Sequence, residues 1–530
     1  MDKGKFLKGA AILAIAGLLT QVLGAIFRIP LGNIIGDTGM GYYQTAYPIY
    51  IFLLVFSTNG APAAISKMVA ERSALGNEFG AHRVFKISFA LMGVISVIFA
   101  GLLFIFAKPI VTMLGNPNAQ LSMMCIAPAL LFVPIMAVFR GYFQGLQIMT
   151  PTAVSQLVEQ TIRVAIGLAL AVFLLPKGLE YAAAGATIGT SIGPIFGLLI
   201  LVLIYKKYLK DKKFELKEHE ERESTPFILK KLIGIAVPIT IGVSIVPIMN
   251  LIDLLIVMRR LQSIGYSESE ANAIYGQLTG FAGPIINIPM AMALSMALAM
   301  VPAISAAASK ENAEELKEHI SLGLSMSTIV GIPCSFGLMA LSKPIMMLLF
   351  PARPETVEVA ANCLFILAIG IVFLCVAQTM AGILQGLNAA GMAVLGLFAG
   401  CIVKAGITYV LCGIPLLNIQ GATIGATLGY ATIGLVNLYA VKKIVNIKFN
   451  LNLSVLKPLL AGIVMFTAVI ITYKGLAIFI SSNFATIISI GVGAIVYSVM
   501  VIALKIMTAD ELEKLPKGAK LAKLVRKIQK

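Results

Sequence analysis

Charged residues are scarce in this sequence, and their scarcity excludes a soluble protein. Only 12% of the 530 residues are charged, whereas 59% are hydrophobic. Soluble domains carry about 25% charged and 45–50% apolar residues, so the chain is a polytopic membrane protein. Its net charge is +17, but most lysines and arginines fall in segments that we predict to face the cytoplasm. The positive-inside rule explains that asymmetry, so no nucleic-acid partner is needed to account for the charge.

Metal ligands and enzyme signatures are also sparse. The three histidines lie in or beside charged loops, and the six cysteines show no CxxC spacing. The cysteines therefore fit small core residues better than a disulfide framework or metal centre. The sequence has no Walker A or HExxH motif, and no GxSxG in a strand–turn–helix setting. We predict that the chain is not an enzyme and has no cofactor, with coupling to the membrane potential or a monovalent cation left open.

Apolar windows long enough to cross a bilayer occur about 14 times, which predicts an all-α polytopic membrane fold. The basic start continues into an apolar run without an A-x-A-type cleavage site, so we interpret it as an uncleaved first span. The charge asymmetry predicts that both termini are cytoplasmic. No loop is large enough to form a separate soluble domain. We expect an N-lobe at 1–205, a charged cytoplasmic linker at 206–231, a C-lobe at 232–445, two further spans at 446–508 and a basic amphipathic cytoplasmic tail at 509–530.

The sequence contains an internal duplication. The matching segments are Gln-Gly-Leu at 144–146 and 385–387, Lys-Pro-Ile at 108–110 and 343–345, and GATIGTSIG at 185–193 with GATIGATLG at 421–429. Such matches in the same order indicate two related halves, which six predicted spans in each would place in the same orientation. We expect the GATIG glycines to serve close helix packing rather than phosphate binding.

Each half places one cation inside a predicted span. Arg163 and Lys404 follow their Gln-Gly-Leu motifs at the same separation, and ionisable groups within a span are costly and therefore functional candidates. Arg163 ends a polar stripe that includes Glu159 one turn earlier. The two can pair along the helix, either as a structural clamp or in a substrate or coupling role. Lys404 has no such local partner, so we predict a distant contact with Asp253, which follows Asn250 by about one turn.

Further candidates lie in spans 1, 2 and 8. Arg28 stands near the outer end of span 1, where its guanidinium suits a phosphate or pyrophosphate, although snorkelling to the outer head groups is an open alternative. Asn59 and Asn287 stand beside prolines, at Pro62 and Pro289. Interruptions in corresponding spans of two halves indicate a transporter's central site, whereas ordinary proline kinks are the alternative.

The sequence resembles a known family at several stretches. These are LLTQVLGAIFRIPLGNIIGDTGMGYY, FSTNGAPAAISKMVAE, FRGYFQGLQIMTPTAVSQLVEQTIRV and KPIMMLLF. They are similar to the stage V sporulation protein B/YtgP branch of the MOP (multidrug, oligosaccharidyl-lipid, polysaccharide) exporter superfamily, which is related to the MurJ lipid II flippases. The resemblance covers nearly the whole chain. Its motifs are moderately specific for the branch and less so for the substrate.

The resemblance implies a V-shaped pair of six-helix lobes of the MATE/MurJ type plus two C-terminal helices. Spans 1, 2, 7 and 8 would line a central cavity, and spans 13 and 14 would form a groove for a polyprenyl tail. In MurJ-type members, cavity arginines meet the pyrophosphate. Arg28 matches such a position to within one residue, Gln21 stands where another arginine would be, and the expected positions near Phe52 and Ile285 are not basic.

The resemblance therefore predicts a bacterial plasma-membrane flippase that moves lipid II, an undecaprenyl-pyrophosphate-linked peptidoglycan precursor, from the inner to the outer leaflet by alternating access. We expect it to act as a monomer among membrane lipids, in cell-wall biogenesis and cell shape or in sporulation. Another lipid-linked polysaccharide unit is an alternative substrate. Cation-coupled multidrug efflux would instead centre on Glu159 and Asp253, and a glycan polymerase would need an outer acidic residue such as Asp37.

Overall fold

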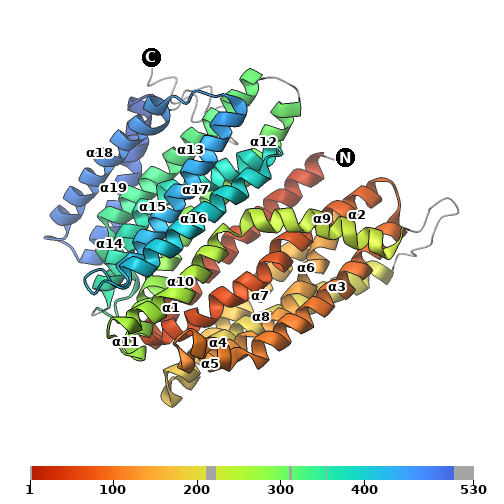
Figure 1. Cartoon of the computed structure of the whole chain (residues 1–530), viewed down its shortest axis with the longest axis horizontal. Helices are drawn as coiled ribbons and strands as arrows, with labels where there is room; N and C mark the ends of the chain where they lie inside the picture. Colours follow the sequence, from red (N-terminus) through yellow and green to blue (C-terminus); the bar gives the residue numbers. More distant parts are fainter. Residues whose placement is uncertain (1–2, 211–222, 310–312, 355, 507–530) are drawn as a thin grey trace. The chain divides into compact units, whose positions relative to one another are not determined.

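The computed structural model describes residues 3–210, 223–309, 313–354 and 356–506, so the predicted tail at 509–530 lies outside the described residues. These residues are helical and contain no strand, which confirms the predicted all-α class. The chain divides into two compact units, Met1–Gly280 and Phe281–Lys530 (Figure 1). The helices of the first unit are α1 (Lys3–Val55), α2 (Ala61–Ala74), α3 (Glu78–Ile105), α4 (Ala107–Met113), α5 (Gln120–Ile126), α6 (Ala129–Gly145), α7 (Thr150–Leu174), α8 (Leu179–Lys210), α9 (Thr225–Val243), α10 (Ile245–Ser263) and α11 (Glu268–Gly276).

The second unit is built in the same way, from long apolar helices and short connections. Its helices are α12 (Gly283–Ser309), α13 (Ala313–Ala340), α14 (Ser342–Leu349), α15 (Val357–Gly386), α16 (Ala390–Leu411), α17 (Gln420–Val445), α18 (Lys457–Leu476) and α19 (Ser482–Ala503). Buried aliphatic side chains of α12, α13, α15 and α17 form one core cluster. A second cluster joins α13 and α14 to α18 and α19, so the two C-terminal helices pack on α13.

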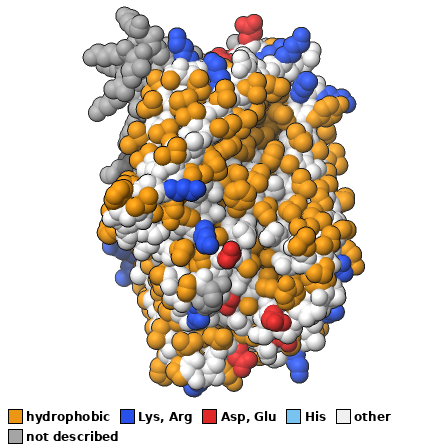
Figure 2. Space-filling view, turned by 90° about the vertical axis from the view of Figure 1, so that its left-hand side faces the viewer, with side chains coloured by type: hydrophobic (Ala, Val, Ile, Leu, Met, Phe, Trp, Pro, Cys, Tyr) orange, Lys and Arg blue, Asp and Glu red, His pale blue; other side chains and the backbone are white. Residues whose placement is uncertain are grey.

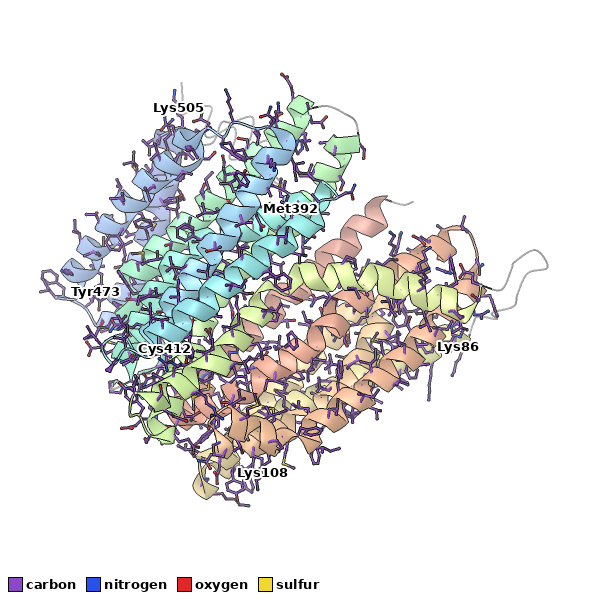
Figure 3. The ribbon with its side chains drawn as sticks, viewed as in Figure 1. Lys86, Lys108, Met392, Cys412, Tyr473 and Lys505 are labelled. Carbon is purple, nitrogen blue, oxygen red and sulfur yellow. The ribbon has the colours of Figure 1, made fainter. Side chains whose placement is uncertain are left out.

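The apolar helices have the length that a bilayer requires. Among the described residues, 11 helices are long and apolar enough to cross a membrane, or up to 12 if a bent pair is one span. Hydrophobic side chains make up most of the surface seen in Figure 2. In Figure 3, the labels Met392 and Cys412 mark the beginning of α16 and the residue directly after its end. The chain is therefore a multi-pass membrane protein, while the count of about 14 spans stays a prediction.

Helix α1 contains the first predicted span, at 6–29, and the first part of the second, at 43–66. Gly36 interrupts its helical geometry with φ 68° and ψ −173°, in a region that glycine reaches without a steric penalty. The guanidinium carbon of Arg28 nevertheless lies 5.1 Å from the centre of the Tyr47 ring, although a straight helix would separate the two residues by roughly 28 Å. The chain must therefore reverse near Gly36, so α1 forms a helical hairpin with an outgoing and a returning arm.

The interruption expected in span 2 is present, whereas that in span 8 is displaced. A π-helical turn at Phe56–Gly60 separates the returning arm of α1 from α2, and the helices meet at 47°. In span 8 the expected break at Asn287 and Pro289 was wrong, because α12 stays helical through Gly283–Ser309. A proline removes one backbone hydrogen bond and need not end a membrane helix. The irregular π turn lies earlier, at Gln277–Ala282.

The segment predicted to open the C-lobe packs with the first compact unit. Helix α9 contacts α2 and the π turn before it, and α1 contacts α10 and α11. At Gly60 an added Cβ would lie 2.5 Å from the carbonyl oxygen of Ala236, so the two backbones approach closely. Glu71 also pairs with Lys231 of α9 at 2.7 Å. The boundary between the compact units thus falls after α11 rather than in the linker at 206–231, and the lobe boundaries stay a prediction.

The GATIG glycines pack against the helices that carry Arg163 and Lys404. Helix α7 packs along α8, and α16 packs along α17. A Cβ on Gly189 would lie 2.7 Å from the carbonyl oxygen of Arg163, and one on Gly425 would lie 3.2 Å from that of Lys404. Side chains at these positions would separate the paired helices. The predicted use of these glycines in close packing is therefore confirmed at both positions.

Candidate functional site

Two arginines and several aromatic rings of the first unit form a compact cluster. Phe27 and Arg28 come from the outgoing arm of α1, and Tyr43 and Tyr47 come from its returning arm. The fifth member is Arg163 of α7, which packs beside α1. The two tyrosines are four residues apart, so they share one face of the returning arm. The hairpin at Gly36 and the packing of α7 thus bring together residues that are far apart in the sequence.

Arg163 lies between two rings and donates a hydrogen bond to a third. Its guanidinium carbon is 5.4 Å from the centres of both the Phe27 and Tyr47 rings, within the range of cation–π attraction. Its Nη2 donates to the Tyr43 hydroxyl at 2.9 Å. Since Phe27 and Tyr43 are buried, their positions are fixed by packing. The Arg163 guanidinium is therefore held in place by aromatic groups rather than by a carboxylate.

The cluster carries two positive charges on the two arginines. Arg28 and Arg163 both contact the Tyr47 ring, at 5.1 and 5.4 Å from its centre. Within the described residues, neither arginine forms an ion pair, and the buried Nε of Arg163 has no hydrogen-bond partner. Uncompensated charge within a membrane-spanning unit is costly. The arrangement favours an anion that guanidinium groups can bind, such as a phosphate or carboxylate.

Glu159 has a different partner from the expected one. Its Oε2 accepts a hydrogen bond at 2.8 Å from Nη2 of Arg140 on α6, and Nε of Arg140 donates to Ser155 at 3.0 Å. The expected pairing of Glu159 with Arg163 on the same helix was therefore wrong. Spacing placed both side chains on one face of α7, but the aromatic cluster holds Arg163 while Arg140 reaches Glu159 from the neighbouring helix.

The other predicted site residues differ in how far they are buried. Asn59 and Asn250 have exposed side chains, whereas Asp253 is 8% and Lys404 is 1% exposed. Asn287 is partly buried on α12, and the side chain of Gln21 lies outside the described residues. Asp253 and Lys404 belong to different compact units, so their contact stays a prediction. Their burial shows that both charges are largely removed from solvent.

A network of side-chain amides joins the turn of α1 to α11 and the π turn that follows it. The Asp37 carboxylate accepts from Gln277 at 2.8 Å. The Asn272 amide donates to the carbonyl of Thr38 at 2.6 Å and accepts from Asn116 at 2.7 Å. Asn116 and Asn272 are fully buried, so these bonds are shielded from water. Asp37 is therefore engaged in holding the turn, which does not favour its use as an exposed enzymatic acid.

Sequence reasoning missed Tyr43, Tyr47 and Arg140. Tyr43, Tyr47 and Tyr50 follow the spacing i, i+4 and i+7, which defines one helical face and was a detectable signal. Arg140 directly follows the fourth predicted span, at 118–139, and so resembled a loop cation. It lies on α6 with a side chain only 15% exposed. No spacing rule within one helix identifies its partner on another.

The fold and the sequence can now be compared with known proteins. A family model described as polysaccharide biosynthesis protein matches residues 6–307, and the MatE model matches residues 238–410. Stage V sporulation protein B of Bacillus subtilis (strain 168) is 29% identical over 97% of this chain and 98% of that protein. Lipid II flippase MurJ of the same organism is 27% identical over 80% of each.

Solved structures show the same fold. Lipid II flippase MurJ in an inward closed conformation matches 93% of this chain and 98% of that chain with a TM-score of 0.69 at 16% identity. An inward-facing multidrug resistance MATE family transporter of the MOP superfamily matches 83% and 98% with a TM-score of 0.69 at 14% identity. The family model covers more than half of the sequence. This multi-pass membrane protein belongs to the polysaccharide biosynthesis protein family.

Proposed function

We propose that the chain is a flippase for lipid II, which it moves from the inner to the outer leaflet of the bacterial plasma membrane by alternating access. The observation that carries the proposal is the pair of guanidinium groups, Arg28 and Arg163, on the ring of Tyr47. Two arginines without a carboxylate partner among the described residues suit a pyrophosphate, because each presents several donors to phosphate oxygens. The similarity to a protein named lipid II flippase supports the same substrate class.

Anion binding by this cluster also suggests a driving force. Moving one elementary charge across the membrane potential is worth about 2.3 kcal/mol per 100 mV. A pyrophosphate that crosses with its charge partly balanced by Arg28 and Arg163 would respond to that potential.

Leaflet accessibility of lipid II tests this proposal. In cells depleted of their own flippases, expression of this chain should restore cleavage of lipid II by an enzyme added outside. Arg28→Ala and Arg163→Ala should each reduce the cleaved fraction at least about tenfold. Each change removes the charge-assisted hydrogen bonds that a guanidinium group donates to phosphate oxygens. Arg260→Ala, which removes a partly exposed guanidinium outside the cluster, should leave cleavage unchanged.

The same experiment distinguishes the alternatives. The family description concerns polysaccharide biosynthesis, so a different lipid-linked glycan is the second candidate. Well-expressed protein that restores no lipid II cleavage, but exposes another lipid-linked glycan in an Arg28-dependent manner, would support that candidate. Cation-coupled drug efflux is less favoured because Glu159 is already paired with Arg140. Efflux that survives Arg28→Ala and is lost in Asp253→Asn would revive it.

A further inference from the structure

A shallow cleft in the second unit lies between the start of α13 and the end of α17. It has a volume of about 550 Å³ and is lined by Lys317, Glu318, Ser321, Asn446, Ile447 and Lys448. Ile447 is 5% exposed and packs with Ile320 in the core cluster below. The cleft therefore has an apolar, fixed floor, whereas its lysines are exposed at the rim. With two lysines and one glutamate, its ionisable side chains carry a net positive charge.

The turn that closes α17 differs from the other left-handed turns of the chain. Five non-glycine residues have positive φ, namely Gln147, Asn388, Asn418, Asn446 and Lys505. In four of them the residue's own N–H donates to a carbonyl three or four residues earlier, and the next N–H is also bonded. Such bonds are the usual ending of a helix. Asn446 is the exception. The backbone N–H groups of Asn446, Ile447 and Lys448 have no acceptor among the described residues.

The N–H groups of Asn446 and Ile447 have no acceptor among the described residues, and they follow the step from the helical Val445 to the left-handed Asn446, which forms an anion-binding arrangement. A helical residue followed by a left-handed one turns consecutive N–H groups toward the same side, and such concave backbone sites bind phosphate. At Asn446 this arrangement opens beside the cleft, where Lys448 adds a charge from the same turn and Lys317 adds one from α13. Ser321, one turn after Lys317 on α13, supplies a hydroxyl. The donors thus come from α13 and from the turn that follows α17.

Neighbouring residues place the cleft at a membrane surface. Past the turn, Ser454 of the α17–α18 connection is buried and hydrogen-bonds Ser325 of α13 at 2.8 Å, and its carbonyl accepts from Thr328 at 2.6 Å. The connection is therefore pinned to α13. Its Leu451 and Leu456 side chains are 58% and 53% exposed. Exposed leucines beside lysines at the ends of spans are typical of chain that lies among lipid head groups.

We propose that this cleft binds a phosphate group, and that the phosphate is the head group of an anionic phospholipid whose chains lie beside Leu451 and Leu456. The site is independent of the transported substrate. Glu318 on the rim opposes an anion, so the two lysines and the backbone donors must together outweigh its charge. Because Lys317 lies on α13 and Lys448 lies on the α17–α18 connection, a bound lipid would join these two segments.

The test compares two double variants that remove the same charge. Full-length protein is reconstituted with phosphatidylcholine and a minor fraction of phosphatidylglycerol, and bound phosphatidylglycerol is counted by native mass spectrometry. Lys317→Gln with Lys448→Gln should weaken binding about thirtyfold, since each of the two lysines near a membrane surface contributes on the order of 1 kcal/mol. Lys442→Gln with Lys443→Gln, exposed in the last turn of α17 but outside the cleft, should retain it. Asn446→Gly keeps the left-handed turn and should also retain it.

The outcomes separate the sources of the phosphate. Equal losses in both double variants would show a diffuse charge effect and overturn the site, as would retention in both. In a second arm, inorganic phosphate is titrated into lipid-free detergent-purified protein while the unfolding temperature is followed. A Lys317- and Lys448-dependent rise as large as that given by phosphatidylglycerol would keep the phosphate site but overturn the lipid. A rise with the lipid alone supports the proposal in full.

Discussion

The helix pairs α7·α8 and α16·α17 are built from matching sequences but hold their cations differently. In both, a GATIG helix packs on the carbonyl of the cation-bearing residue, Arg163 or Lys404. Arg163 is partly buried and surrounded by aromatic rings. Lys404 is 1% exposed, and its helix carries an apolar stripe where α7 carries Gln156, Glu159 and Gln160. The same scaffold therefore presents a polar face in one half and encloses a charge in the other.

The two helix pairs share the glycine contacts that serve packing, but only α7 has a polar face that can serve binding. Close packing by glycine depends on backbone geometry and is retained in both pairs. The polar face of α7 depends on side chains, and it positions Arg163 beside α1, where Tyr43 and Tyr47 complete the cluster. A buried lysine on an apolar helix face is better suited to stabilising a helix pair than to binding a ligand. We therefore expect Lys404 variants to lose stability and Arg163 variants to lose transport.

The largest expected effect is on Lys404. Lys404→Ala should lower the free energy of unfolding by about 3–5 kcal/mol, because we predict that Lys404 is one member of a buried charge pair, whose removal leaves the other charge uncompensated. If the predicted partner is Asp253, adding Asp253→Ala should recover part of the loss. Unfolding of detergent-solubilised protein measures both effects. Arg163→Ala serves as the comparison and should lower the free energy of unfolding by less. Additive losses in the variant with both Lys404→Ala and Asp253→Ala would exclude Asp253 as the partner.

A smaller effect is expected from the ion pair between Arg140 and Glu159. Their side chains are 15% and 22% exposed, so a double-mutant cycle with Arg140→Gln and Glu159→Gln should give a coupling energy of about 1–3 kcal/mol. The same cycle with Arg163→Gln in place of Arg140→Gln should give no more than about 0.5 kcal/mol. A larger coupling to Arg163 would restore the pairing along α7 that the sequence predicts. The second half offers no equivalent pair, since Gly400 occupies the corresponding position.

The sequence predicts backbone features of these pairs better than side-chain partners. Apolar windows, the duplication and the GATIG motifs were sufficient for the all-helical fold and for close packing at Gly189 and Gly425. The interruption before Ala61 was also predictable, from its glycine and proline. The pairing of Arg140 with Glu159 and the ring contacts of Arg163 were not, because they depend on how separate helices turn toward one another. Periodicity identifies the face of one helix but not the neighbour that covers it.

The smallest expected effect distinguishes the two glycine contacts themselves. Gly189 and Gly425 occupy equivalent positions, but a Cβ on Gly189 would meet only backbone atoms, namely Gly167 Cα and N at 2.6 Å and the Arg163 carbonyl oxygen at 2.7 Å. A Cβ on Gly425 would chiefly meet the Thr408 hydroxyl, which belongs to a side chain. Backbone atoms of a packed helix cannot move aside without separating the pair, whereas a hydroxyl can rotate away.

Gly189→Ala should therefore destabilise the protein by about 1–2 kcal/mol, which is the overpacking cost less the gain in helix propensity. Gly425→Ala should be nearly neutral by the same balance. Gly101→Ala on α3, where a Cβ meets nothing within 4 Å, gives the propensity gain alone and should be slightly stabilising. The three unfolding midpoints should rank Gly101→Ala above Gly425→Ala above Gly189→Ala. Equal decreases in the unfolding midpoint for Gly189→Ala and Gly425→Ala would mean that the Thr408 side chain is held as rigidly as backbone atoms. The two helix pairs would then tolerate added volume equally poorly.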